Sequence, residues 1–136
     1  MILTSGCFDG LHSGHVAYLH AAAALDPAQP LVVAVAPDAY IRTVKHREPR
    51  WSQAARAETV AALRAVTRVV THDEPSIAAT IRRLRPTMVV KGLDWVSTIP
   101  ADVASACVEA GATLAFVDAE RTHSREVDWR AMGEAL

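Results

Sequence analysis

The chain contains little of several residue types that would mark other classes of protein. Its 136 residues include only two cysteines, Cys7 and Cys107, whose separation matches no metal-binding spacing, so we expect two reduced thiols. Aromatic residues make up 5%, so alanine, valine and leucine must fill most of the core. No apolar run approaches the roughly 20 residues of a membrane-spanning helix. The net charge of -1 lacks the basic excess of a nucleic-acid-binding surface. Neither a membrane nor a nucleic acid is therefore expected as a partner.

The chain does contain enough apolar sequence for one domain of ordinary size. Hydrophobic residues make up 51% and charged residues 21%, a balance typical of a folded protein with a sizeable core. Met1–Thr4 leads directly into an apolar segment and shows no signal-peptide pattern. We expect a single cytoplasmic domain over residues 1–136.

Short β-branched segments alternate with longer alanine-rich segments along the chain. Leu31–Val35 and Met88–Val90 are apolar throughout, as in strands that are buried on both faces. This alternation predicts an α/β fold, a single doubly wound, Rossmann-like domain with a five-stranded parallel sheet. The expected strands are 2–6, 31–36, 68–71, 88–91 and 113–117, and the expected helices are about 15–25, 52–63, 76–84, 100–110 and 125–136. Ser52 and Ser76 are candidate N-caps, and Gly111 is a candidate helix stop.

The most unusual segment follows the first expected strand and reads Gly6-Cys7-Phe8-Asp9-Gly10-Leu11-His12-Ser13-Gly14-His15. A helix N-terminus presents unpaired backbone N–H groups and the positive end of the helix dipole, which both favour a phosphate. His12 and His15 add two imidazoles that suit the charge developing on a phosphate under attack. The histidines at positions 20, 46 and 72 are instead interpreted as surface residues.

In a parallel sheet the segments after the strands meet at the carboxyl edge, where doubly wound folds bind ligands. The polar residues expected there are Asp9, His12, His15, Asp38, Lys91, Asp94, Arg121, Thr122 and Ser124. The charged segment Arg42–Ser52 is the candidate for a mobile active-site loop, and it adds Lys45, with Arg56 in the helix that follows. This set is rich in phosphate-binding groups and contains no nucleophile with an adjacent base. It favours phosphoryl or nucleotidyl transfer over covalent acyl transfer.

Residues 6–19 closely resemble the signature of the cytidylyltransferase-like nucleotidyltransferases. The resemblance continues through Asp38, Arg56 and the segment 85–95, and it covers most of the chain in the right order. The nearest members are the adenylyltransferase domains of ADP-heptose synthases and the glycerol-3-phosphate cytidylyltransferases. The resemblance implies that AMP or CMP passes from ATP or CTP to a phosphorylated sugar or polyol, of the heptose 1-phosphate or glycerol 3-phosphate type, with release of pyrophosphate.

The resemblance also implies roles for individual residues. His12 and His15 would stabilise the pentacoordinate transition state, and Lys45 would fold onto the phosphates from the mobile loop. Asp9 would face the acceptor. The nucleotide would be bound by Cys7, Phe8, Gly14, Arg56, Lys91, Gly92, Asp94, Arg121, Thr122 and Ser124. Mg²⁺ would be held mainly by the nucleotide phosphates and not by a protein site. A homodimer is among the assemblies that the resemblance implies.

Three positions depart from the family's usual pattern. Where the family has a Ser/Thr run before its last helix, this chain has Arg121-Thr122-His123-Ser124, so a non-catalytic nucleotide-binding module is an alternative. Leu93 replaces the second glycine of the usual Lys-Gly-Gly-Asp. Trp95 is typical of the cytidylyltransferases, whereas the heptose enzymes have tyrosine, so the choice between ATP and CTP stays open. A flavodoxin-like redox or signalling domain would share the fold class but does not account for the histidine pair.

Overall fold

The computed structural model describes residues 1–118, in which strands and helices alternate. The strands are β1 (Ile2–Gly6), β2 (Leu31–Val35), β3 (Arg68–Thr71), β4 (Met88–Gly92) and β5 (Thr113–Val117). The helices are α1 (Ser13–Ala24), α2 (Asp38–Val44), α3 (Gln53–Ala61), α4 (Ala78–Leu84) and α5 (Ala101–Ala110), and a single 3-10 turn, η1 (Leu93–Trp95), follows β4. The helix expected over 125–136 lies outside the described residues.

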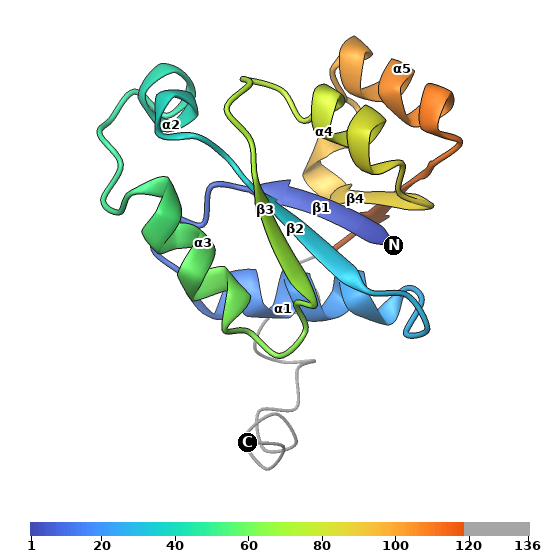
Figure 1. Ribbon diagram of the computed structural model, residues 1–136, viewed down its shortest axis with the longest axis horizontal. Helices are drawn as coiled ribbons and strands as arrows, with labels where there is room; N and C mark the ends of the chain where they lie inside the picture. The colour runs from blue at the N-terminus through green and yellow to red at the C-terminus, as the bar shows by residue number, and fades with distance from the viewer. Residues whose placement is uncertain (119–136) are drawn as a thin grey trace.

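The described strands form one parallel sheet in the order β3-β2-β1-β4-β5. The chain begins at the centre of the sheet, builds outward to β3, and then crosses over to add β4 and β5 on the other side. Helices α1 and α3 cover one face of the sheet, and α4 and α5 cover the other (Figure 1). This arrangement confirms the predicted doubly wound α/β fold with a five-stranded parallel sheet.

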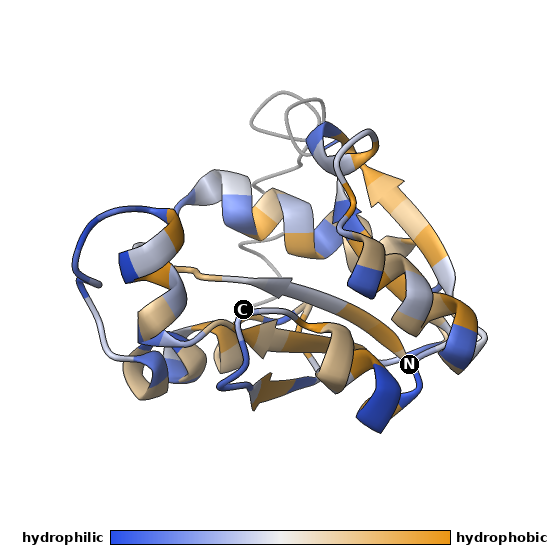
Figure 2. Ribbon diagram, turned by 90° about the horizontal axis from the view of Figure 1, so that it is seen from above, coloured by the Kyte–Doolittle hydropathy of each residue, from blue (hydrophilic) through white to orange (hydrophobic). Residues whose placement is uncertain are grey.

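A separate hydrophobic core lies on each face of the sheet. Neighbouring residues of β1 point to opposite faces, so Ile2 packs in the core with Leu19 of α1, and Leu3 packs in the core with Ile81 of α4. All four side chains are fully buried. The strands are therefore largely hydrophobic (Figure 2). The loop between α2 and α3 is hydrophilic, and it projects from the left edge of the molecule in that view. Burial on both faces explains the uniformly apolar sequence of β2.

The local signals placed most element ends within a few residues, but one helix was missed. Asp38–Val44 forms α2, so the irregular segment begins after Val44 instead of at Arg42. This helix is only seven residues long and is held by one buried side chain, Ile41, so it has no periodic pattern in the sequence. Ser52 is confirmed as an N-cap, because its Oγ accepts the Ala55 N–H at 3.2 Å.

Two further boundary signals had different outcomes. Gly111 ends α5 in the left-handed conformation, with φ of 69°, as predicted. The N-cap of α4 is Ile77 and not Ser76, although the Ser76 Oγ does accept the Ala78 N–H at 3.2 Å.

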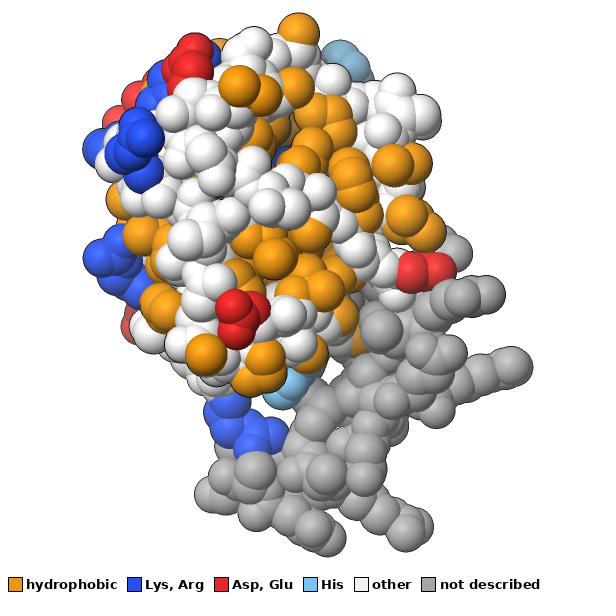
Figure 3. Space-filling view, turned by 90° about the vertical axis from the view of Figure 1, so that its right-hand side faces the viewer, with side chains coloured by type: hydrophobic (Ala, Val, Ile, Leu, Met, Phe, Trp, Pro, Cys, Tyr) orange, Lys and Arg blue, Asp and Glu red, His pale blue; other side chains and the backbone are white. Residues whose placement is uncertain are grey.

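The side of the molecule next to β5 and α5 exposes mainly hydrophobic and uncharged side chains (Figure 3). Val108 of α5 is 80% exposed, and Val96, just after η1, is 57% exposed. Within residues 1–118 the longest helix is α1, and no helix is both long and apolar enough to cross a membrane.

Candidate active site

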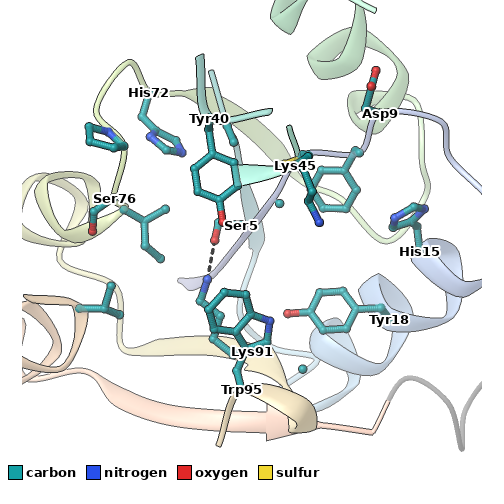
Figure 4. A pocket seen from close by; sticks show the side chains of 18 of the residues that line it. Ser5, Asp9, His15, Tyr18, Tyr40, Lys45, His72, Ser76, Lys91 and Trp95 are labelled. Carbon is teal, nitrogen blue, oxygen red and sulfur yellow. Dashed lines mark hydrogen bonds between the residues drawn. The ribbon is translucent and has the colours of Figure 1, made fainter. Parts of the chain in front are cut away.

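A cavity of about 690 Å³ lies at the carboxyl edge of the sheet, beyond the ends of β1, β2 and β4. This is the point at which the strand order reverses, where doubly wound folds bind their ligands. Figure 4 shows side chains from the β1–α1 turn, from α2, from the turn after β3 and from the segment after β4 around this space. The predicted site residues that line it are Cys7, Phe8, Asp9, His12, His15, Lys45, Lys91, Gly92 and Asp94.

The two histidines of the motif build the first turn of α1. His12 is the N-cap, and its Nδ1 accepts the backbone N–H of Gly14 at 3.0 Å. In return, the backbone N–H of His12 donates to Nδ1 of His15 at 3.3 Å, which completes a reciprocal capping box. The imidazole rings lie side by side, with centroids 4.0 Å apart. Gly14 thus serves through its backbone, and the spacing of the motif follows from the geometry of one helix turn.

These backbone contacts also decide where the histidine protons are. A nitrogen that accepts a hydrogen bond carries no proton, so neutral His12 and neutral His15 are both protonated on Nε2. Burial, and then the neighbouring charges of His12 and Lys45, lower the pKa of His15 from 6.5 to about 4. At neutral pH the His15 ring is therefore an uncharged N–H donor. Both histidines line the cavity.

The backbone of the β1–α1 turn is shaped by Phe8. This residue has a φ of 52°, and its ring folds into the core, where 5% of the residue remains exposed. A Cβ on Gly6 would lie 2.9 Å from the Phe8 ring, so only glycine fits at that position. Cys7 keeps its thiol at the cavity wall, and burial raises the pKa of that thiol. The first glycine of the motif is therefore required by packing.

The residues after β4 form a second wall of the cavity. Lys91 Nζ donates to Ser5 Oγ at 2.9 Å and lies 5.1 Å from the centroid of the Trp95 ring (Figure 4). Burial lowers the pKa of Lys91. A Cβ on Gly92 would lie 2.6 Å from Asp94 Oδ1, so the glycine lets this carboxylate fold back beside the strand end. The segment brings one cation, one carboxylate and one indole to the same wall.

The loop between α2 and α3 brings three cations, Lys45, Arg47 and Arg50, to the cavity. Asp9 holds this loop. Its carboxylate accepts the backbone N–H groups of Arg50 (2.9 Å) and Trp51 (3.0 Å) and a charged hydrogen bond from Arg47 Nη1 (2.6 Å). The Asp9 side chain is 1% exposed. Although it lies at the cavity wall, its oxygens are occupied by the loop, so Asp9 anchors the segment that carries Arg47 and Arg50.

Asp9→Asn is expected to weaken this attachment and to reduce the acid sensitivity of the fold. Burial alone would raise the pKa of Asp9, but the hydrogen bonds from Arg50, Arg47 and Trp51 lower it from 3.8 to about 2. A depressed carboxyl pKa stabilises the fold above the unfolded pKa, and the stabilisation is lost as the pH falls through the folded value. The wild type should therefore lose more free energy of unfolding between pH 4 and pH 2 than Asp9→Asn does. Urea unfolding at each pH measures this, and equal losses in the two proteins would contradict it.

Arg56 lies elsewhere than expected for a residue that anchors the triphosphate. It is 1% exposed and is absent from the wall of the main cavity. Its Nη1 donates to the carbonyls of Cys7 and Ala36 at 2.8 Å each, its Nε to the carbonyl of Trp51 at 3.0 Å, and its Nη2 to Asp38 Oδ1 at 2.6 Å. The guanidinium therefore ties the ends of β1 and β2 to α2 and to the loop before α3. This buried position supports a structural role instead of direct contact with phosphate.

Some residues of the cavity were not predicted from the sequence. His72 was expected on the surface, but it is 4% exposed and lines the cavity, because the turn after β3 folds inward. Tyr18 lines the cavity too, and its hydroxyl lies 2.7 Å from Thr4 Oγ1 and donates to the Val90 carbonyl at 3.2 Å. Burial raises the pKa of Tyr18 to about 12. Arg121, Thr122 and Ser124 lie outside the described residues.

The described carboxylates do not build a metal cage. Among residues 1–118 no three His, Cys, Asp or Glu side chains lie together in a group that could hold a metal ion. Asp9 is committed to the loop, and Asp102 Oδ1, also at the cavity, accepts the backbone N–H of Val103 at 2.9 Å. A divalent ion in this cavity would need most of its oxygen ligands from a bound molecule.

Comparison with known proteins agrees with this geometry. Residues 3–128 match the family model described as cytidylyltransferase-like. The bifunctional protein HldE of Azorhizobium caulinodans is 39% identical over 121 residues, which covers 87% of this chain and 24% of that protein. The protein of the same name from Coxiella burnetii is 43% identical over 96 residues, which covers 70% of this chain and 20% of that protein. This chain thus spans no more than about a quarter of the length of these curated relatives.

A solved structure also resembles the fold. The crystal structure of the lipopolysaccharide core biosynthesis protein from Thermoplasma volcanium matches with a TM-score of 0.70 and 25% sequence identity. The match covers 86% of this chain and 95% of that one.

Proposed function

The chain belongs to the cytidylyltransferase-like family, and from this membership and the geometry of the cavity we propose that it is a nucleotidyltransferase. It transfers AMP or CMP from ATP or CTP to the phosphate of a small sugar or polyol. The acceptor is of the heptose 1-phosphate or glycerol 3-phosphate type. Pyrophosphate is the second product.

The observation that carries the proposal is the pair of Nε2–H donors at the start of α1. Because the capping box uses Nδ1 of both His12 and His15, Nε2 of each ring is left to donate to a phosphate bound in the cavity at this helix N-terminus. A neutral donor such as His15 stabilises negative charge that increases on phosphoryl oxygens, without binding the ground state as tightly as a full charge would. No covalent intermediate is required.

In the proposed reaction an oxygen of the acceptor phosphate attacks the α-phosphorus of the triphosphate. The bond from the α-phosphorus to the oxygen that bridges it to the β-phosphate breaks, and pyrophosphate leaves with that electron pair. His12 and His15 donate to oxygens of the reacting phosphate. Lys45, Arg47 and Arg50 offset the charge of the phosphates from the loop that Asp9 holds.

The nucleoside and the metal ion complete the proposal. Lys91, Gly92, Asp94 and the Trp95 ring border the nucleoside, and Cys7 and Phe8 lend backbone beside it. Mg²⁺ held mainly by the triphosphate oxygens would offset part of their charge. A homodimer, cytoplasmic location and a triphosphate-binding role for Arg121, Thr122 and Ser124 remain part of the proposal.

Incubation with pairs of substrates tests this function directly. ATP, CTP, GTP and UTP are each combined with heptose 1-phosphate or glycerol 3-phosphate in the presence of Mg²⁺, and pyrophosphate release is measured. We expect one of the ATP or CTP pairs to give pyrophosphate together with a nucleoside-diphosphate-linked product. If no pair gives pyrophosphate while calorimetry shows triphosphate binding, the chain is the non-catalytic nucleotide-binding module instead.

A further inference from the structure

His72 is a buried histidine in the cavity wall with one hydrogen-bonding nitrogen unused. It lies directly after β3, and only 4% of the residue is exposed. Its Nδ1 is 2.8 Å from the backbone carbonyl of Glu74, and its Nε2 has no hydrogen-bond partner among residues 1–118. Buried polar atoms in folded proteins nearly always have a partner, so the buried, unpaired Nε2 of a residue that lines the cavity points to a ligand.

The contact with Glu74 sets the tautomer of this ring. A carbonyl oxygen can only accept, so Nδ1 of His72 must carry the proton and donate it. Neutral His72 therefore presents Nε2 as an acceptor, the opposite of the Nε2–H donors of His12 and His15. Burial lowers the pKa of His72, which favours this neutral form. The two sides of the cavity thus offer opposite hydrogen-bonding chemistry.

The surroundings of His72 differ from the phosphate side in charge as well. Figure 4 shows His72 and Ser76 on one side of the cavity and His15 on the other, with Tyr40 and Lys45 between them. Pro75, Ser76 and Ile77, which line the wall next to His72 in sequence, are uncharged, and the charges that act on the ring are the carboxylates of Glu74 and Asp73 and the ammonium of Lys91. An acceptor nitrogen in such a wall suits an uncharged hydroxyl group and not a phosphate oxygen.

The position of His72 is also fixed from the backbone side. Gln53 Nε2 donates to the carbonyl of His72 at 2.8 Å and to the carbonyl of Val35, at the end of β2, at 3.1 Å. The turn after β3 is therefore tied to the neighbouring strand, and the ring is held from both its backbone and its Nδ1. A group held this firmly, with its lone pair unused, is suited to discriminate between ligands.

We propose that His72 is a specificity-determining residue whose Nε2 accepts a hydrogen bond from a hydroxyl group of the phosphorylated acceptor. This rests on the proposed nucleotidyltransferase function and adds to it that the acceptor carries a hydroxyl group at the end distant from its reacting phosphate. The site rejects analogues that lack this hydroxyl, because Nε2 would then stay buried without a partner.

The test compares His72→Asn with His72→Gln in the full chain. The asparagine amide keeps the donor to the Glu74 carbonyl and removes the group at Nε2, whereas glutamine places an amide oxygen near the position of Nε2. Steady-state pyrophosphate release is measured with whichever of glycerol 3-phosphate and heptose 1-phosphate turns over, with its analogues that lack one hydroxyl, and with 2′-deoxy and 3′-deoxy triphosphates.

We expect His72→Asn to raise KM for the acceptor about five- to tenfold, the usual effect of losing one hydrogen bond, and to leave KM for the triphosphate unchanged. With the wild type, one of the deoxy acceptors should show the same rise in KM. With His72→Asn, removing that hydroxyl group should raise KM no further. His72→Gln should recover part of the affinity. An unchanged acceptor KM in His72→Asn, or a loss that follows the deoxy triphosphates instead, overturns the proposal.

A second measurement separates this inference from the proposed function. In ¹⁵N-histidine-labelled protein, Nε2 of His72 should resonate as an unprotonated imidazole nitrogen and should shift when heptose 1-phosphate or glycerol 3-phosphate is added. Absence of pyrophosphate with every pair refutes the transferase function whatever the spectra show. Pyrophosphate formation with no response of Nε2 to the acceptor refutes the role of His72 alone. Urea unfolding of both variants checks that the fold is intact.

Discussion

His15→Asn is expected to lower kcat about 100- to 1000-fold, the usual effect of removing one preorganised donor to a developing negative charge. The asparagine side-chain oxygen can still accept the backbone N–H of His12, so the capping box and the start of α1 are retained. What is lost is the Nε2–H donor at the cavity. Pyrophosphate release under saturating substrates measures the effect. KM for the triphosphate should change much less than kcat, because the donor acts mainly on the transition state.

His20→Asn is the matched control for this substitution. His20 lies on the same helix but does not line the cavity, so kcat should stay within about twofold of the wild type while the helix suffers the same change of residue type. Equal losses in His15→Asn and His20→Asn would show that the histidines act through the stability of α1. A large rise in KM for the triphosphate with unchanged kcat would assign His15 to ground-state binding only.

The β1–α1 turn could be predicted from the sequence because its chemistry is local. The glycines, the two histidines and the strand before them are contiguous, and the three-residue spacing is that of a capping box. The parallel sheet could also be predicted from the sequence, since uniformly apolar strands such as β2 occur where both faces of the sheet are covered. Which nitrogen of each ring carries the proton could not be predicted. That depends on the backbone contacts of Nδ1, which no residue pattern records.

The contacts that sequence reasoning missed all join distant segments. Asp9 is separated by about forty residues from the loop that occupies its carboxylate, and Arg56 binds carbonyls at the ends of two different strands. His72 follows a short edge strand and was interpreted as a surface residue, yet its turn folds into the cavity. Charge and residue type suggested ligand binding for Asp9 and Arg56. Only the tertiary structure shows that the protein itself uses these groups.

Arg56→Met is expected to lower the free energy of unfolding by about 3–5 kcal/mol, because each buried carbonyl left without its donor costs about 1–3 kcal/mol. The guanidinium is fully buried and donates four hydrogen bonds, to three backbone carbonyls and to Asp38. Methionine can fill much of the volume but satisfies none of these acceptors. Urea unfolding followed by circular dichroism measures the loss. Arg83→Met, on an exposed position of α4, should change the stability by less than about 0.5 kcal/mol.

Arg56→Lys distinguishes the structural role of this residue from a role in phosphate binding. A lysine ammonium keeps the positive charge but cannot match the fork of the guanidinium, so it reaches fewer of the four acceptors. If Arg56 is structural, the lysine variant should lose stability, but less than Arg56→Met does. The variant that loses more stability should then also show the larger rise in KM for the triphosphate. If instead both variants are as stable as the wild type and the methionine variant alone loses triphosphate affinity, Arg56 binds the nucleotide directly. The buried position of the guanidinium favours the first outcome, because a phosphate could reach it only after the contacts to Cys7 and Ala36 had broken.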